Sequence, residues 1–154
     1  MKLAKFYIIT VGIISIIVAL AGIYYNIQGL LTDFSDLLND HEISYFYYAF
    51  YTMSAICMAC YALLMICGIK FMFLKTGIYK VFIGVLVFET VYFFPFSVMW
   101  MVPEFGMSIS AATGVANGGL MFQGFILFPF WAPFVVIYAS KRLNLKQKEL
   151  MNDR

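Results

Sequence analysis

Charged residues are scarce in this sequence, and that scarcity excludes an ordinary soluble domain. Only 12% of the 154 residues are Asp, Glu, Lys or Arg, and 64% are hydrophobic. Soluble domains contain about 25% charged and about 45–50% apolar residues. A chain of this length could not bury so much apolar surface in water, so we expect lipid to cover the excess. The composition predicts an integral membrane protein, and the formal charge of +2 gives no indication of nucleic-acid binding.

Recognised catalytic and metal-binding patterns are also missing. The sequence contains one histidine and three cysteines, and no metalloprotease, phosphate-loop or Ser–His–Asp arrangement. We therefore predict no catalytic residue, metal site or cofactor, and favour a protein that is not an enzyme. Cys57 and Cys60 form a C-x-x-C motif that resembles the one in quinone-coupled membrane thiol oxidases. Those enzymes relay electrons to a second cysteine pair, whereas only Cys67 is left here, so we interpret the three thiols as packing residues.

Long apolar segments make up most of the chain. Crossing the hydrocarbon core of a bilayer takes about 20 helical residues. Four segments reach that length, over about residues 6–25, 45–69, 78–102 and 114–139. The sequence thus predicts an all-α membrane protein with one domain over residues 1–154, built as a bundle of four transmembrane helices. No internal repeat is evident, so any transport pathway is expected to form between copies of the chain.

The sign of the charges alternates between successive connections. All ten basic residues lie before the first segment, around the second connection, or in the tail over residues 141–154. The other two connections contain no Lys or Arg, and their acidic residues are Asp33, Asp36, Asp40, Glu42 and Glu104. Because basic loops stay in the cytoplasm, both termini are predicted to be cytoplasmic. A Lys- and Ile-rich chain without an Asn-x-Ser/Thr acceptor is typical of a multi-pass protein of a bacterial inner (plasma) membrane.

The first acidic connection has the periodicity of a helix. Between residues 27 and 40, apolar residues recur at helical spacing; they are Ile27, Leu30, Leu31, Phe34, Leu37 and Leu38. The acidic residues lie off this stripe. We predict a short amphipathic helix between the first two transmembrane helices, which rests on the outer interface or caps the bundle. The alternatives are a lid over a cavity and a surface that docks a partner.

Small residues mark the faces on which helices can approach one another. Gly12 and Ala19 share a face of the first segment, and Gly114 and Gly118 follow a small-xxx-small pattern in the fourth. Helix association in lipid depends on close van der Waals packing, which small side chains permit. These faces pack either within the bundle, or against another copy of the chain or a partner membrane protein.

A single carboxyl group interrupts the third segment. Glu89 lies near its middle, where a charge costs at least about 2.5–3.5 kcal/mol on insertion scales. On a helix, Glu89 shares its face with the aromatic residues Tyr92, Phe93, Phe96 and Trp100. Aromatic rings around a carboxylate can hold a lipophilic cation by charge and by cation–π attraction. A desolvated carboxyl group can exchange its proton for that cation.

Polar residues on other segments are candidates to satisfy Glu89, namely Tyr61, Asn117 and Gln123. These features support a proton-coupled transporter or a binder of lipophilic or cationic small molecules. The alternative is a non-enzymatic accessory, assembly or protective subunit that packs against a partner membrane protein. A purely structural Glu89 would instead be protonated and donate one hydrogen bond between helices.

Overall fold

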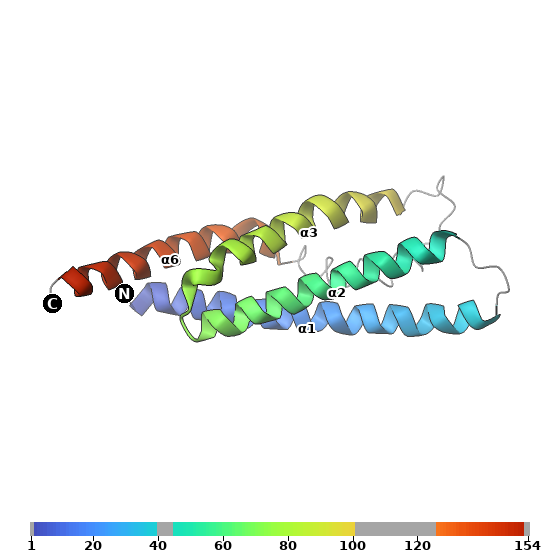
Figure 1. Ribbon diagram of the computed structural model, residues 1–154, viewed down its shortest axis with the longest axis horizontal. Coiled ribbons are helices and arrows are strands. Elements are labelled where there is room, and N and C mark those ends of the chain that lie inside the picture. The colour runs from blue at the N-terminus through green and yellow to red at the C-terminus, as the bar shows by residue number, and fades with distance from the viewer. Residues whose placement is uncertain (1, 40–44, 101–125, 153–154) are drawn as a thin grey trace.

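The computed structural model describes the backbone of residues 2–39, 45–100 and 126–152 (Figure 1). Side chains are described for residues 2–28, 31, 52, 54–91 and 126–144. The elements are α1 (Lys2–Asn39), α2 (Tyr45–Met72), the short 3-10 helix η1 (Thr76–Ile78), α3 (Tyr79–Trp100) and α6 (Phe128–Asn152). None of the described residues forms a β-strand. The prediction of an all-helical chain is confirmed for these ranges.

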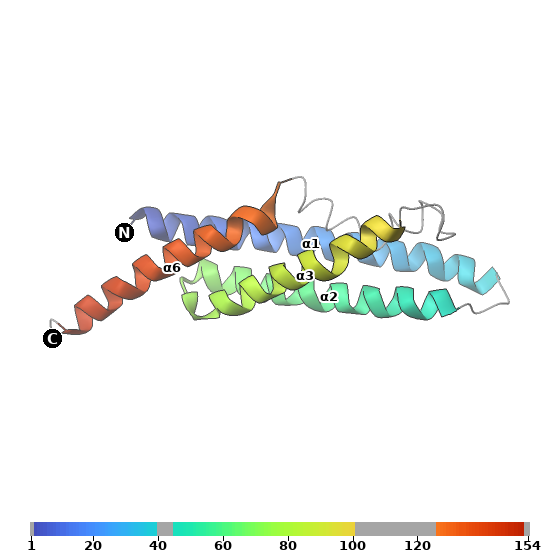
Figure 2. The same ribbon diagram turned by 90° about the horizontal axis from the view of Figure 1, so that it is seen from above.

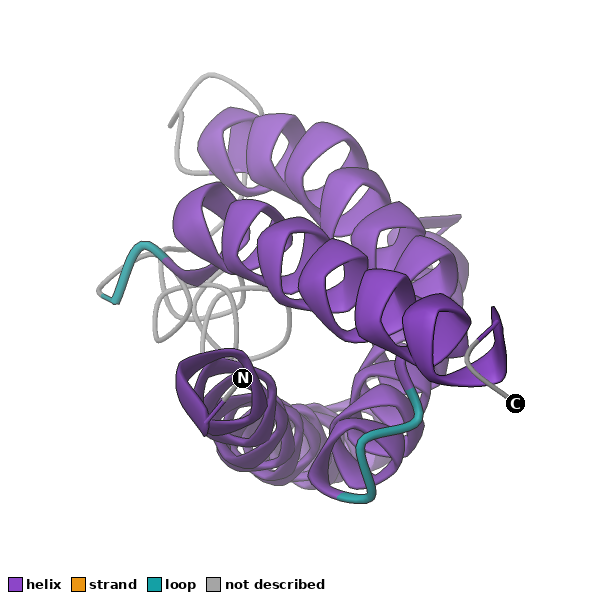
Figure 3. Ribbon diagram, turned by 90° about the vertical axis from the view of Figure 1, so that its left-hand side faces the viewer, coloured by secondary structure: helices purple, strands orange, loops and turns teal. Residues whose placement is uncertain are grey.

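The helices form an elongated bundle in which packed neighbours run antiparallel. α1 packs against α2 and α6, and α3 packs against the same two helices (Figures 1 and 2). Seen from its end, the molecule has two layers, with α1 and α2 in one and α3 and α6 in the other (Figure 3). Two stretches are long and apolar enough to cross a membrane, Lys2–Gln28 in α1 and Ser54–Met72 in α2. They overlap the first two predicted segments, over residues 6–25 and 45–69.

α1 is longer than the sequence predicted. It is one uninterrupted helix of 38 residues, which corresponds to about 57 Å at 1.5 Å per residue. The prediction of a separate amphipathic helix over residues 27–40 is therefore wrong, because this segment continues the first helix along the same axis (Figure 2). No proline lies between the two stretches, and the single Gly29 costs only about 1 kcal/mol in a helix interior.

The fourth predicted segment also differs from the structure. A turn at residues 126–127 precedes α6, and Leu127 adopts a positive φ of 51°. The indole Nε1 of Trp131 donates to the carbonyl oxygen of Ile126 across this turn (2.8 Å). Pro129 follows in the first turn of α6, where a missing N–H is tolerated. The prediction of one continuous helix over residues 114–139 is therefore wrong, because a turn interrupts this segment at residues 126–127.

The tail predicted after residue 140 is not separate from the fourth helix. α6 continues to Asn152, so most of the basic C-terminal segment is helical. Residues 114–125, with Gly114 and Gly118, lie outside the described ranges, as does Glu104. The predicted third segment, over residues 78–102, corresponds to α3, which has 22 residues.

The turn between α2 and α3 determines where α3 starts. Leu74 has a φ of 58°, and its N–H donates to the carbonyl oxygen of Phe71 (2.9 Å). The N–H of Lys75 donates to the carbonyl oxygen of Lys70 (2.9 Å). This pair of bonds is the Schellman motif that ends many helices. Thr76 Oγ1 then donates to Asn144 Oδ1 (3.4 Å), which ties the turn to α6.

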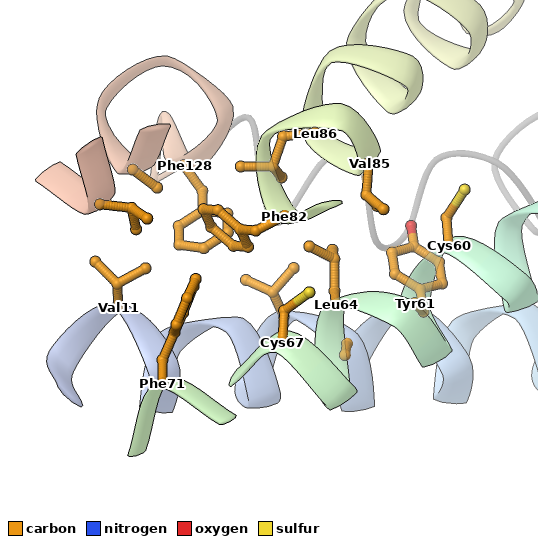
Figure 4. Packing of buried hydrophobic residues seen from close by; sticks show 14 of the residues in the cluster. Val11, Cys60, Tyr61, Leu64, Cys67, Phe71, Phe82, Val85, Leu86 and Phe128 are labelled. Carbon is orange, nitrogen blue, oxygen red and sulfur yellow. The ribbon is translucent and has the colours of Figure 1, made fainter. Parts of the chain in front are cut away.

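An aromatic cluster next to this turn fixes the orientation of α3. Phe71 on α2, Phe82 on α3 and Phe128 on α6 are fully buried and meet edge to face (Figure 4). Ring centroids are 5.2 Å apart for Phe71 and Phe82, and 6.1 Å apart for Phe82 and Phe128. With Phe82 facing inwards, residues three, four and seven positions later face inwards too.

Basic residues gather at the end of the bundle where both termini lie. The N-terminus of α1, the α2–α3 turn and the C-terminal part of α6 all lie at the left of Figure 1. These segments contain Lys2, Lys5, Lys70, Lys75, Lys80, Lys141 and Arg142. The acidic Asp33 and Asp36 belong to the opposite end of α1. The separation of charge along the sequence is therefore also a separation along the bundle.

Candidate functional site

Glu89 lies inside the helix bundle. The buried residues Phe82, Val85, Leu86 and Glu89 follow one another on a single face of α3. Glu89 itself is only 1% exposed, and it is the only acidic residue among the side chains that the structure describes. The buried face of α3 therefore places Glu89 inside the bundle, and an outward orientation is excluded.

Three buried side chains on α2, namely Cys57, Cys60 and Tyr61, are within electrostatic range of the Glu89 carboxyl group. Figure 4 shows Cys60 and Tyr61 directed from α2 towards Val85, which lies one turn before Glu89 on α3. Tyr61, which the sequence suggested as a polar partner, is thus directed from α2 towards this part of α3. The three cysteines are free and buried, as the interpretation of packing residues expects.

Tyr61 is held in place by a glycine on α1. A Cβ atom on Gly22 would overlap the ring of Tyr61, so the ring rests directly on the backbone of α1 at this point. Any larger residue would push the phenol away. Tyr61 therefore contacts α1 through its ring and lies close to Glu89 of α3, although it belongs to α2.

A hydrogen-bonded pair of buried polar residues joins α2 to α1 next to Cys57. Ser54 Oγ donates to Asn26 Oδ1 (2.9 Å), and Asn26 Nδ2 donates to the carbonyl oxygen of Gly22 (3.3 Å). Asn26 and Ser54 are both buried, and Asn26 also lies beside the Cys57 thiol. Cys57 therefore lies beside Asn26 and within electrostatic range of Glu89. We call the six residues from three helices the polar core: Asn26, Ser54, Cys57, Cys60, Tyr61 and Glu89.

Asn26 and Ser54 were missed by sequence reasoning. The first apolar segment was ended at Tyr25, which placed Asn26 in a connection rather than in a helix. A signal was present, because Asn26 follows Gly22 by four residues and Ala19 by seven, and so continues the small-residue face of α1. Ser54 gave no comparable signal, since its partner lies on another helix.

For the other residues predicted to bind a ligand, the structure describes no side chain. Tyr92, Phe93, Phe96 and Trp100 belong to α3, but their side chains are outside those that the structure describes. Asn117 and Gln123 lie outside the described ranges altogether. Of the predicted set, only Glu89 has a described environment.

The small-residue face of α1 packs within the chain. A Cβ atom on Gly12 would lie 2.8 Å from the carbonyl oxygen of Gly68, and one on Gly68 would lie 2.7 Å from that of Gly12. Ala19 is fully buried. The backbones of α1 and α2 therefore cross in direct contact, and this contact keeps Gly22 and Tyr61 opposite each other.

The polar core combines few kinds of chemical group. It offers one carboxyl group that can hold or release a proton, beside one aromatic ring and two polarizable sulfur atoms. No three His, Cys, Asp or Glu residues in the described part of the chain are placed to hold a metal ion. The arrangement suits the binding of a proton or of one positively charged group.

No protein-family model matches the chain, and neither the curated proteins nor the solved structures contain a significant match. The geometry of the polar core is therefore the basis for a functional assignment.

Proposed function

We propose that this chain is a multi-pass membrane protein in which Glu89 is a proton-coupled site for a lipophilic or cationic small molecule. The observation that supports this proposal is the burial of a single carboxyl group in an apolar bundle. Leu at this position would fill similar space without the cost of placing an ionisable group in hydrocarbon. Such a group keeps its proton or exchanges it for a cation, which is the step that a proton-coupled binder or transporter requires.

Large apolar side chains on the outside of the bundle support insertion into lipid. The most exposed lie on several helices, and include Leu3, Phe6, Tyr24, Leu31, Phe73, Val91 and Phe134. Phe134 on α6 is 74% exposed. Lipid would cover these side chains, whereas in water their exposure would be unfavourable. The basic end of the bundle then lies in the cytoplasm, following the positive-inside rule.

The test compares wild type with Glu89→Gln, which keeps shape and hydrogen bonding but cannot titrate. Purified protein in weakly buffered detergent is mixed with tetraphenylphosphonium, sodium or potassium salts, and the protons released are counted with a pH indicator. We expect at least one cation to release about one proton per wild-type chain, because cation and proton compete for one carboxyl group. We expect no release from Glu89→Gln.

Thr90→Ala is the matched control for this experiment. Its hydroxyl donates to the carbonyl oxygen of Leu86 in its own helix (2.8 Å), so its loss leaves the polar core intact. Thr90→Ala should release protons like wild type, and both variants should melt like wild type. If no cation releases a proton from wild type, or if Glu89→Gln releases as many as wild type, the proposed function is wrong.

A second candidate function is suggested by the length of α1. With 38 residues, α1 is about 57 Å long, which exceeds the roughly 30 Å of the hydrocarbon core, and Leu31 in its C-terminal half is 64% exposed. An apolar surface beyond the membrane span could pack against a partner membrane protein, which is the accessory-subunit alternative. Purification from native membranes in mild detergent, followed by mass spectrometry, tests it. A stoichiometric second membrane protein would favour this alternative over a ligand site.

A further inference from the structure

We propose that the basic end of the bundle holds a site for the phosphate of an anionic phospholipid headgroup. The site consists of Lys70 and Lys75 at the α2–α3 turn and Lys141 on α6, and we call these three residues the headgroup site. The positive-inside rule does not require such a site, because it concerns the orientation of helices and not their contacts with lipid. The proposal shares the membrane with the proposed function, but it does not depend on Glu89.

A backbone hydrogen bond holds two of the lysines together. The N–H of Lys75 donates to the carbonyl oxygen of Lys70 (2.9 Å), so the two residues lie side by side in the turn. Both side chains are exposed. A lysine carries its ammonium group on a flexible four-carbon stem. The two charges can therefore reach the same anion above the turn.

A hydrogen bond between side chains brings the third lysine to this turn. Thr76 directly follows Lys75, and its Oγ1 donates to Asn144 Oδ1 on α6 (3.4 Å). Lys141 lies three residues before Asn144, so the two residues are neighbours on one face of α6. Lys141 is also exposed. Basic residues that are far apart in the sequence thus meet where the α2–α3 turn lies beside α6, at the left of Figure 1.

An anion between these lysines would relieve an electrostatic cost. Like charges held close together repel one another and destabilise the folded chain. The bonds that form the turn join backbone atoms, or Thr76 to Asn144, and none of them uses a lysine ammonium group. The turn therefore does not need the charges in order to form. A phosphate placed among them replaces the repulsion by charge-assisted hydrogen bonds.

The surface of the turn is open beside the lysines. Gly77 is exposed, and a Cβ atom on it would meet no atom within 4 Å. A headgroup can therefore approach the turn at this point without displacing a side chain.

Apolar side chains in the same turn favour a lipid over a soluble phosphate. Phe73 is 73% exposed and Met72 is 44% exposed, and both lie between Lys70 and Lys75 in the sequence. Exposed apolar and basic residues occur together in segments at the headgroup level of a membrane. There the apolar groups contact acyl chains, while the charged ends reach the polar layer. The turn therefore offers contacts to both parts of a phospholipid.

The first experiment compares two lipids and one soluble phosphate on the full chain. Purified protein in an uncharged detergent is titrated with phosphatidylglycerol, phosphatidylcholine or glycerol phosphate, and bound molecules are counted by native mass spectrometry. We expect phosphatidylglycerol to bind at least tenfold more tightly than either of the others. Phosphatidylcholine has no net negative charge, and glycerol phosphate has no acyl chains to contact Phe73. Equal binding of the two lipids, or equally tight binding of glycerol phosphate, would overturn the proposal.

Two adjacent residues of α6 provide a matched pair of variants. Lys141 shares the face of Asn144, whereas the guanidinium carbon of Arg142 lies over the ring of Tyr138, 5.7 Å from its centroid, on another side of the helix. One basic residue near an anionic headgroup contributes about 1 kcal/mol, which is about fivefold in Kd. Lys141→Gln should therefore weaken phosphatidylglycerol binding about fivefold, and Arg142→Gln should stay within about twofold of wild type. Equal losses would mean general attraction to the basic end, and the site would be wrong.

Gly77 allows a second test that leaves every lysine in place. Gly77 does not have a positive φ, and its surroundings are open, so Asp and Asn both fit there and differ in charge but hardly in size. Gly77→Asp should weaken phosphatidylglycerol binding at least fivefold, because its carboxylate competes with the phosphate for the lysines. Gly77→Asn should bind like wild type, and thermal unfolding shows that both variants are folded. If Gly77→Asp is folded and binds like Gly77→Asn, the proposal is wrong.

The results separate this proposal from the function proposed for Glu89. Glu89 lies 13 residues after Thr76, roughly 20 Å along α3, so Glu89→Gln should bind phosphatidylglycerol like wild type. A wild-type chain that prefers phosphatidylglycerol but releases no proton to any cation would contradict the proposed function alone. A chain that releases its proton but binds both lipids equally would contradict the headgroup site alone.

Discussion

At the residue scale, the contact between Gly22 and Tyr61 assembles the polar core, and it makes an unusual prediction for a glycine in a helix. Ala is normally about 1 kcal/mol better than Gly in a helix interior. A Cβ on Gly22 would overlap the Tyr61 ring, and overpacking of a core costs about 1–3 kcal/mol. Gly22→Ala should therefore lower the free energy of unfolding, as measured by thermal or denaturant unfolding in detergent.

Gly84 on α3 provides the control for this prediction. A Cβ at Gly84 would meet no atom within 4 Å, so Gly84→Ala should be neutral or stabilising. In a Tyr61→Leu background, Gly22→Ala should lose most of its cost, because the ring that it displaces is gone. Equal effects of Gly22→Ala and Gly84→Ala would contradict the packing of Tyr61 on α1.

The sequence predicted Glu89 as a site residue, but it did not predict the α2 residues around it as a group. Glu89 was identifiable because an ionisable residue in a long apolar run is costly. Its inward orientation was not predicted and comes from the structure, in which Phe82, Val85 and Leu86 share its buried face. The α2 residues around it were not predictable as a group. Helical periodicity gives the faces of one helix, but the rotation of α2 against α3 depends on contacts between helices, such as those of Phe71 and Phe82.

At the element scale, the bond between Asn26 and Ser54 joins α1 to α2 beside the site. A double-mutant cycle of Asn26→Ala and Ser54→Ala should give a coupling free energy between about 0.6 kcal/mol, the average measured for hydrogen bonds between membrane helices, and about 1.7 kcal/mol, the largest value. Unfolding in detergent measures each variant. Ser15→Ala is the control, because the Ser15 hydroxyl donates to the carbonyl oxygen of Val11 in its own helix (2.7 Å). Coupling between Ser15→Ala and Ser54→Ala should be absent, and coupling of that size would argue against a specific pair.

Helix boundaries were predicted less well than the helices themselves. The division of α1 at residue 26 was wrong because polar residues such as Asn26 and Gln28 resemble a connection, although neither one ends a helix. The break before α6 was missed because Ile126 and Leu127 are apolar, and a positive φ at Leu127 has no signal in the sequence. Apolarity indicates where a segment lies, whereas caps and turns determine where a helix ends.

At the scale of the whole molecule, the charges at the two ends of the bundle predict its orientation. In a bacterial host, a green fluorescent protein fused after Arg154 should fluoresce, because the C-terminus is predicted to be cytoplasmic. Alkaline phosphatase, which needs disulfides that form outside the cytoplasm, should be active when inserted after His41 and inactive after Lys75. Activity after Lys75, or none after His41, would contradict this topology.

The distribution of basic residues also predicts how robust this orientation is. Three separate segments of the chain bring basic residues to the same end of the bundle: the start of α1, the α2–α3 turn and the second half of α6 (Figure 1). Replacing Lys70, Lys75 and Lys80 by Glu removes the positive charge from only one of them. Because Lys and Arg near the membrane set orientation and acidic residues contribute little, the two other segments should still retain both termini inside. The same reporters should therefore give unchanged readings in this triple variant, whereas removing Lys2 and Lys5 as well should produce a mixture of orientations. An inverted triple variant would show that the α2–α3 turn alone sets the topology.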